Sequence, residues 1–284
     1  MKRGLTFAAI AGTALAAMLG ASGSGAHPTG DGGTPATPDE AGRFVPDLVA
    51  ILPGTVSIAS RTSRRGPRTL LAFSASVANN GAGPMIVRTR RGGAGFGVLA
   101  ARQVVTRTDG RRELAGGTLR LRFVRGGGHS HFHLEDFMRY ELRTVGGRSL
   151  RRDRKTGFCL GDRYDATGPA RMPGEPASPV FRSSCGRNRP TLTSLTEGIS
   201  VGFGDDYPAV REGQFVDVTG LPSGRYVLVL RVDPMGKLLD LHEDNDASSM
   251  LVRIDRGGTT RARILSWCPS TDSCTTAGRH RRLP

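Results

Sequence analysis

The sequence predicts an all-β protein: an antiparallel β-sandwich with long irregular loops and few helices. Short segments rich in β-branched and aromatic residues recur along the chain, and Gly, Pro and Asn-Gly turn signals separate them. No segment shows the apolar spacing of an amphipathic helix longer than two turns. Many short strands joined by such turns are typical of β-sandwiches, because each sheet buries one face against the other.

The predicted strands run from the start of the folded part to its end. They cover residues 55–60, 69–77, 85–89, 118–124, 132–142, 214–219, 226–232 and 249–254. Residues 226–232 are almost all apolar, which predicts a central strand buried on both faces. Residues 165–196 carry several Pro, Gly and Ser residues and no periodicity, so we expect a long loop that is either functional or disordered.

The chain divides into four expected segments. Residues 1–26 resemble a signal peptide, with a charged start, an apolar stretch and small residues before the expected cleavage site. Residues 27–43 form a flexible linker, 44–268 the folded domain and 269–284 a basic C-terminal tail. The apolar stretch is too short and too rich in Gly and Ala for a membrane span. We therefore expect a secreted protein whose mature chain has no membrane span.

The charge of the chain is strongly positive, with 40 Lys and Arg against 25 Asp and Glu and a formal net charge of +15. Such a charge invites a nucleic-acid partner, but the arginines are dispersed in pairs and aromatic residues make up only 6%, which leaves few stacking platforms. Expected export also argues against nucleic acid. Anionic cell-surface polymers are the better partner for this field.

Four cysteines occur in this expected extracellular protein, and their even number predicts two disulfides. Proximity in the sequence favours the pairs Cys159–Cys185 and Cys268–Cys274. Free or zinc-bound thiols are the alternative, but no C-x-x-C pair is present.

Three of the six histidines, His129, His131 and His133, stand at alternate positions. On a strand, alternate side chains share one face at a rise of about 3.3 Å per residue, so a local twist could bring the three imidazoles onto one metal ion. Imidazole suits copper, zinc, iron or nickel, and the ligands alone do not choose among them. The alternative is a solvent-facing basic stretch.

Several segments in order resemble the lysyl oxidase family. The H-x-H-x-H run at 129–133 leads into an acidic and aromatic strand, like the family's copper-binding stretch. K-T-G-F-C-L at 155–160 and G-I-S-V-G-F-G-D-D-Y at 198–207 resemble the two segments that supply the family's quinone cofactor. Q-F-V-D-V-T at 214–219 resembles a further family motif. The resemblance covers roughly residues 44–255 and makes 44–268 a lysyl oxidase-like catalytic domain.

The resemblance implies an exported copper-dependent amine oxidase. Histidines 129, 131 and 133 would ligate Cu(II), and Lys155 and Tyr207 would cross-link into lysine tyrosylquinone. The substrates would be dioxygen and a primary amine, which could be peptidyl lysine in a protein; the products would be an aldehyde, hydrogen peroxide and ammonia. Asp205 is the candidate catalytic base, although a carboxylate at this position could equally cap a turn.

The resemblance also implies a calcium site. P-D-L at 46–48 and D-L-H-E-D-N-D at 240–246 resemble two family segments that meet around this ion. Carboxylate and amide oxygens are the ligands that Ca²⁺ prefers. The candidate ligands are Asp47, Leu48, Asp240, Asn245 and Asp246. His242 stands where the family has an acidic residue, and an acidic solvated loop is the alternative.

Two other functions remain open. Residues 221–248, an L-P-x-G-x-Y segment followed by an acidic loop, also resemble immunoglobulin-like adhesion modules without enzymatic activity. That interpretation leaves the histidines, Lys155 and Tyr207 without a role. The second alternative is a protein that binds copper without forming a quinone.

Overall fold

The computed structural model describes residues 36–276, except 65, 90–96, 127–128, 154, 156 and 210–212, and it describes His129 without its side chain. The signal peptide expected at 1–26, most of the expected linker and the end of the tail lie outside the described residues. The described strands belong to the compact unit that spans Gly33–Pro284.

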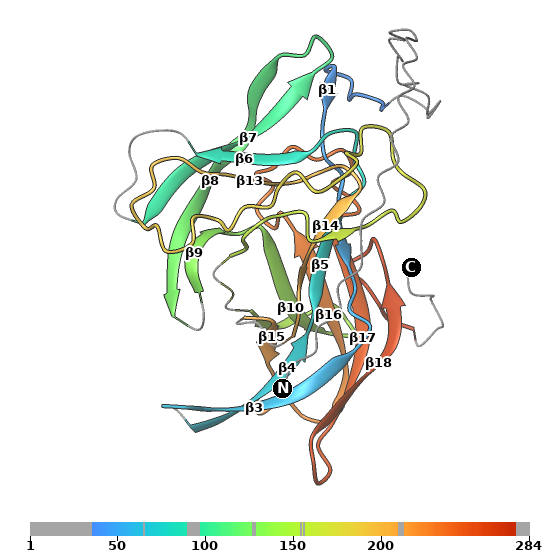
Figure 1. The fold of residues 1–284 in the computed structure, drawn as a ribbon. Coiled ribbons are helices and arrows are strands. Elements are labelled where there is room, and N and C mark those ends of the chain that lie inside the picture. The colour runs from blue at the N-terminus through green and yellow to red at the C-terminus, as the bar shows by residue number, and fades with distance from the viewer. Residues whose placement is uncertain are drawn as a thin grey trace, which may run out of the picture. The chain divides into compact units, whose positions relative to one another are not determined.

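The described strands form antiparallel sheets, and the described residues contain no helix (Figure 1). The predicted all-β, antiparallel class is therefore confirmed. None of these residues belongs to a helix that is long and apolar enough to cross a membrane.

The strands of the described residues are arranged in four sheets. The six-stranded sheet has the order β13-β6-β7-β8-β9 with β1 on β7, from β1 (Arg43–Phe44), β6 (Met85–Thr89), β7 (Val98–Arg107), β8 (Arg112–Gly126), β9 (His129–Leu134) and β13 (Thr196–Ile199). The five-stranded sheet has the order β11-β10-β16-β17-β18, from β10 (Met138–Thr144), β11 (Ser149–Arg152), β16 (Gly224–Val232), β17 (Ala247–Asp255) and β18 (Arg261–Cys268). The four-stranded sheet has the order β12-β14-β5-β2, from β2 (Leu48–Ile51), β5 (Ala75–Asn79), β12 (Tyr164–Asp165) and β14 (Phe203–Tyr207). The three-stranded sheet has the order β15-β4-β3, from β3 (Val56–Ser63), β4 (Gly66–Phe73) and β15 (Phe215–Asp217).

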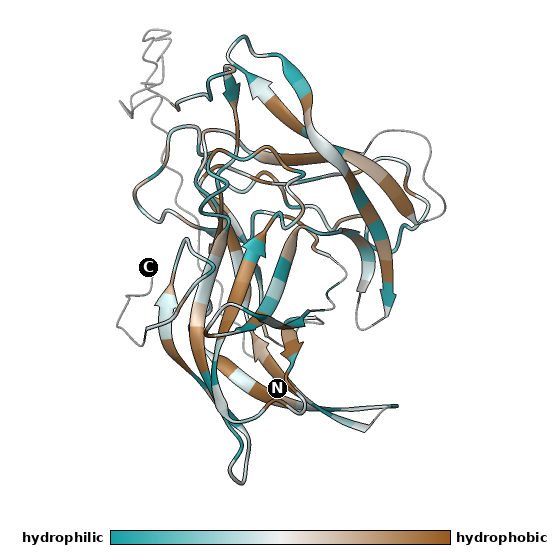
Figure 2. Ribbon diagram, turned by 180° about the vertical axis from the view of Figure 1, so that it is seen from behind, coloured by the Kyte–Doolittle hydropathy of each residue, from teal (hydrophilic) through white to brown (hydrophobic). Residues whose placement is uncertain are grey.

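Strand β16 lies in the middle of the five-stranded sheet and is buried on both faces, as its apolar sequence predicts. Leu228 and Leu230 join the main core, whereas Val227 and Val229 join a second cluster on the opposite face. Figure 2 shows hydrophobic residues along the strands of this region. Phe132 of β9 and Phe158 belong to the same main core as Leu228 and Leu230.

Two predicted strands are each broken into two. The strand expected at 69–77 is interrupted at Ser74, where the chain leaves the sheet of β4 and enters the sheet of β5. The strand expected at 132–142 is interrupted by a turn in which Asp136 adopts a left-handed backbone with φ of 57°. Aspartate tolerates this conformation better than most residues, so the turn costs little.

The segment expected to be a long loop, residues 165–196, is anchored at its two ends and in its middle. It begins with the last residue of strand β12, which pairs with β14, and ends with the first residue of strand β13, which pairs with β6. In its middle, the Asp162 carboxylate accepts hydrogen bonds from the backbone amides of Val180 and Phe181, at 2.7 and 3.0 Å. The Cys159–Cys185 disulfide is a further anchor, and Cys268–Cys274 closes a short loop near the C-terminus. Both predicted cysteine pairs are confirmed.

Candidate active site

Strand β9 points two of the three candidate histidines to one face. Phe132 between them is fully buried in the core, and its ring packs on Phe123 at 5.1 Å. On the opposite face, the Nε2 atoms of His131 and His133 lie 2.9 Å apart. His129 pairs with Gly126 through the backbone, and its side chain lies outside the described residues. Alternation along the strand therefore brings the imidazoles of His131 and His133 together.

The segment that carries Lys155 is held directly against the histidine strand. Phe158 and Leu134 exchange two backbone hydrogen bonds, of 2.7 and 3.0 Å. Gly157, with φ of 145°, lies between Lys155 and Phe158 in the chain. A Cβ atom on Gly157 would lie 2.4 Å from the Leu134 carbonyl oxygen and 2.9 Å from the Cβ atom of His133. Only glycine permits this approach of the two segments.

The Lys155 amine lies in a corner formed by two aromatic rings. Its Nζ atom is 4.7 Å from the centroid of the Tyr207 ring and 4.6 Å from that of Phe158. The two rings meet edge to face at 4.8 Å. Such distances give favourable cation–π contacts. The structure therefore brings together Lys155 and Tyr207, which are far apart in the sequence.

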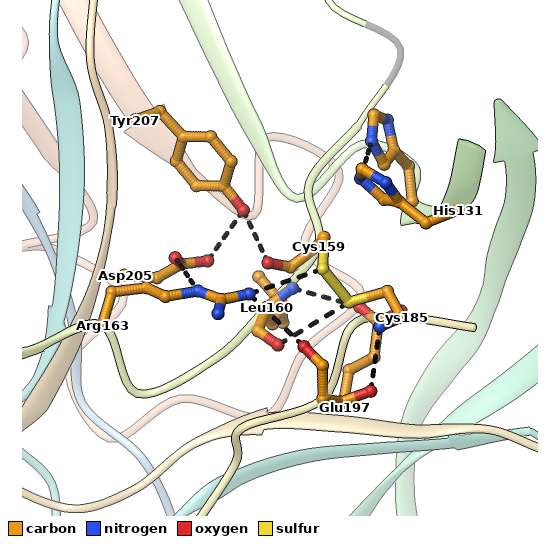
Figure 3. The surroundings of a disulfide bond; sticks show 10 residues. His131, Cys159, Leu160, Arg163, Cys185, Glu197, Asp205 and Tyr207 are labelled. Carbon is orange, nitrogen blue, oxygen red and sulfur yellow. Dashed lines mark hydrogen bonds and ion pairs between the residues drawn. A yellow bond between two sulfur atoms is a disulfide. The ribbon is translucent and has the colours of Figure 1, made fainter. Parts of the chain in front are cut away.

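Tyr207 ends strand β14, and its hydroxyl is held by two oxygen atoms (Figure 3). The Asp205 Oδ2 atom and the Cys159 carbonyl oxygen both lie 2.8 Å from it. Cys159 is bound in the disulfide to Cys185, whose carbonyl oxygen accepts a hydrogen bond of 2.7 Å from the Phe132 amide. The disulfide thus links the tyrosine to the histidine strand.

Burial controls the protonation of the Asp205 carboxyl and of the Tyr207 hydroxyl. Asp205 is only 1% exposed, and burial raises its pKa to about 8 although Tyr207 and Arg163 favour the ionised form. Burial, Asp205 and Glu197 together raise the pKa of Tyr207 well above its ordinary value. At neutral pH Asp205 therefore carries a proton. It can donate this proton to the Tyr207 oxygen while Tyr207 donates to the Cys159 carbonyl oxygen.

Lys155 and Tyr207 line one cavity of about 390 Å³, together with His131, His133, Arg163 and Asp205. The size is that of a small-molecule site. The cavity thus brings together an amine, a phenol, a protonatable carboxyl and paired imidazoles, which can exchange protons and, through the imidazoles, bind a metal ion. Within the described residues, no three side chains from His, Cys, Asp and Glu already converge on a metal position. The third imidazole of the predicted set would have to come from His129.

Several residues of this site were not predicted from the sequence. Phe158 supplies the second ring against Lys155. Arg163 lies between Asp205, at 3.5 Å, and the disulfide, as Figure 3 shows. Glu197 is fully buried behind the disulfide, where it accepts a hydrogen bond from the Leu160 amide and burial raises its pKa well above its ordinary value. No local pattern marks Arg163 or Glu197, because their roles depend on long-range contacts.

The residues of the predicted calcium site also lie together. Asn245 donates a hydrogen bond of 2.8 Å to Asp47 Oδ1, and the Leu48 amide donates one of 2.9 Å to Asp240 Oδ2. His242 Nδ1 lies 3.2 Å from Asp47 Oδ2. The segment at 46–48 therefore meets the acidic loop that follows β16.

Two oxygens in this acidic cluster are buried and have no hydrogen-bond partner among the described residues: Asn245 Oδ1 and Asp246 Oδ1. Burial, Asp240 and further carboxylates raise the pKa of Asp246 to about 8. Burial raises the pKa of Asp240 to about 6, with Asp47 adding to the effect. Crowded hard oxygens with raised pKa values are a donor set that a calcium ion fits.

Comparison with known proteins identifies relatives whose names agree with one another. A family model described as lysyl oxidase matches residues 111–260, a segment that includes every candidate residue except Asp47 and Leu48. The chain is 29% identical to chicken (Gallus gallus) protein-lysine 6-oxidase over 142 residues, which is 49% of this chain and 29% of that protein. It is 30% identical to human lysyl oxidase homolog 1 over 147 residues, 51% of this chain and 22% of the relative. The match thus spans less than a third of either relative.

Proposed function

This chain belongs to the lysyl oxidase family, and we propose that it is an exported copper- and quinone-dependent amine oxidase. One observation carries the proposal: the Lys155 Nζ atom lies 4.7 Å from the centroid of the Tyr207 ring. A covalent cofactor made from these two side chains requires an amine and a phenol ring in contact. The same cavity contains His131 and His133.

The proposed reaction oxidises a primary amine with one molecule of dioxygen. The amine RCH₂NH₂ and water give the aldehyde RCHO and ammonia and release two electrons and two protons. Dioxygen takes up both and becomes hydrogen peroxide, so atoms and electrons balance. Peptidyl lysine is one substrate to consider, because the relatives include a protein-lysine 6-oxidase.

His131 and His133 would hold the copper ion, with His129 as the third ligand. Two ring nitrogens 2.9 Å apart support this role, because neutral imidazoles at such a distance can turn toward one cation. His133 is 4% exposed, so little solvent competes for its nitrogen. Bound copper would supply redox chemistry with dioxygen for the oxidation of the Tyr207 ring.

The chain itself would position the reacting groups and move protons. The aromatic corner of Phe158 and Tyr207 orients the Lys155 amine toward the ring to which it would be joined by one N–C bond. Asp205 is the proposed base: above a pH of about 8 it is ionised and can accept a proton from the carbon next to the substrate nitrogen. Arg163 holds Asp205 in place from the other side.

A calcium ion bound by Asp47, Asp240, Asn245, Asp246 and the carbonyl of Leu48 is part of the proposal as a structural element. The buried oxygens of Asn245 and Asp246, which have no hydrogen-bond partner among the described residues, support it. His242 occupies one side of Asp47 and would act as a hydrogen-bond partner of that ligand.

The proposal is tested by amine-dependent peroxide release and by labelling with phenylhydrazine after the mature protein has bound Cu(II) in air. We expect both signals in the unaltered protein and neither in Lys155→Arg or Tyr207→Phe, with copper binding retained. Lys237→Arg and Tyr226→Phe are matched controls, because neither residue lines the cavity. Copper binding without labelling would instead indicate a copper-binding protein, and the absence of both would favour an adhesion module.

A further inference from the structure

The lining of the candidate cavity is rich in cationic side chains. Besides Lys155 and Arg163, the cavity is lined by Arg182 and Arg187 and by the hydroxyl-bearing Ser183 and Ser184 between them. The carboxylates on the cavity are Asp205 and Asp206. Basic side chains thus outnumber acidic ones around the groups that would react.

The segment that carries the two arginines is fixed against the histidine strand. Cys185 is tied by its disulfide and by the hydrogen bond of its carbonyl oxygen to the Phe132 amide. The Asn188 amide donates a hydrogen bond of 2.6 Å to the carbonyl oxygen of Ser130. A side chain carried on a backbone held at two points loses less freedom when it binds a ligand.

The two arginines are available to a ligand. Arg182 uses its Nε atom to donate a hydrogen bond of 3.1 Å to the Pro179 carbonyl oxygen, and both side chains are exposed. Neither forms an ion pair with a carboxylate of the described residues, whereas Arg143 pairs with both Glu141 and Asp272. A guanidinium with free donors is suited to bind a carboxylate through two parallel hydrogen bonds.

The acidic side chains of the cavity compensate the positive charge of its basic side chains only in part. Asp205 faces Arg163, but burial keeps its pKa at about 8, so at neutral pH it is mainly uncharged. Asp206, which is exposed, is the other carboxylate on the cavity. The formal net charge of +15 adds a field of the same sign, which attracts anions and repels polycations.

We propose that Arg182 and Arg187 form a subsite for a carboxylate, so that the preferred substrates are primary amines that carry a carboxylate a few carbon atoms away. This inference rests on the proposed oxidase function for the amine end of the substrate. A carboxylate subsite makes polycationic chains poor substrates, even though their primary amines can undergo the same reaction. A cavity of about 390 Å³ admits a small amino acid with its amine toward Tyr207 and its carboxylate toward the arginines.

Binding without turnover is the first test. Hexanoate is titrated into the full-length mature protein at low ionic strength and followed by calorimetry, with hexanamide as its uncharged match. We expect hexanoate to bind more tightly than hexanamide, and about tenfold more weakly in Arg182→Gln/Arg187→Gln, because the lost hydrogen bonds are to a charged group. Arg225→Gln, an exposed arginine on β16 away from the cavity, is the control and should bind as the unaltered protein does. Hexanoate binding that survives the double substitution would overturn the subsite.

Substrate preference is the second test. The values of kcat/KM are compared for 6-aminohexanoate, hexylamine and 1,6-diaminohexane, which present an anion, a methyl group and a cation at the same distance. We expect 6-aminohexanoate to be preferred, and the double variant to lose about tenfold of its preference over hexylamine, mainly through KM. Preference for the diamine would contradict the proposal. If none of the amines is oxidised, the oxidase function fails, while the hexanoate titration still decides the subsite.

Discussion

Two glycines, Gly157 and Gly213, allow Lys155 to lie close to Tyr207. The Lys155 stem packs on Gly213, where an added Cβ atom would lie 3.0 Å from its Cβ and Cγ atoms. Gly157 gives the lysine segment its approach to β9. Residues without side chains therefore decide whether the amine can reach the ring.

Gly157→Ala tests this at a single residue. The new methyl group would clash with the Leu134 carbonyl oxygen, and we expect a loss of about 1–3 kcal/mol in the free energy of unfolding. Hydrazine labelling should fall with it, because the lysine segment must move away from the histidines. Urea unfolding and labelling of the same samples measure the two effects.

Gly147→Ala is the matched control. Gly147 also has a positive φ, of 87°, but a Cβ atom there would meet nothing within 4 Å. It should lose stability through backbone strain alone and keep its labelling. Equal labelling of both variants would show that close approach at Gly157 is not required.

Asp205 gives a prediction on pH. Its pKa rises from 3.8 to about 8 on folding, so the folded state binds more protons than the unfolded state across this range. The contribution of Asp205 to the free energy of unfolding is therefore complete below the unfolded pKa of 3.8, and it is lost as the pH rises through the folded pKa of about 8. Asp205→Asn should therefore make the free energy of unfolding fall less steeply between pH 5 and 8, by up to about 1.4 kcal/mol per pH unit.

The same carboxyl should govern the rate. If Asp205 is the base, kcat rises with pH up to about 8 and then levels, and Asp205→Asn removes most of the activity. Asp109→Asn, in an exposed turn, is the control for both measurements. An unchanged slope of stability and an unchanged rate profile in Asp205→Asn would contradict the assignment.

At the scale of elements, the Cys159–Cys185 disulfide joins the tyrosine strand to the histidine strand. Cys159 holds the Tyr207 hydroxyl through its carbonyl oxygen, and Cys185 binds β9 through the Phe132 amide. Replacing both cysteines with serine should lower hydrazine labelling and cost about 3 kcal/mol of stability. The Cys268–Cys274 pair, which closes a shorter loop, should cost less stability and leave labelling intact. Labelling that is insensitive to the first pair would argue against this link.

The acidic loop after β16 should respond to calcium. An ion that binds only the folded state stabilises it by RT ln(1 + c/Kd), where c is the free ion concentration, so the melting temperature rises with the logarithm of the ion concentration above Kd. We expect this rise in the unaltered protein, measured by thermal unfolding with and without Ca²⁺, and its loss in Asp47→Asn and Asp246→Asn. Asp244→Asn lies in the same loop but is exposed and should retain the response. A melting temperature independent of Ca²⁺ in all variants would exclude the site.

At the scale of the whole molecule, local sequence patterns predicted the class of fold well and the arrangement of sheets less well. The apolar run at 226–232 gave strand β16 because burial on both faces leaves an unmistakable composition. Strand β7 (Val98–Arg107) was not predicted, since its burial follows no clean alternation. The change of sheet at Ser74 depends on which partners lie nearby, and no local pattern carries that information.

The candidate site was predicted in a similarly uneven way. Alternation along one strand was enough to bring His131 and His133 together. The meeting of Lys155 with Tyr207 followed only from the family resemblance, because contacts between distant segments have no local signature. Arg182 and Arg187 were not singled out, since an arginine in a chain with 40 basic residues becomes distinctive only through its neighbours in space.

The proposed covalent bond between Lys155 and Tyr207 is tested most directly by peptide mapping of the mature protein after exposure to Cu(II) in air. We expect one linked peptide that contains both residues, absent from Lys155→Arg and from protein kept without dioxygen. Recovery of both residues in separate, unmodified peptides from protein that has bound copper and been exposed to air would contradict the proposed cofactor.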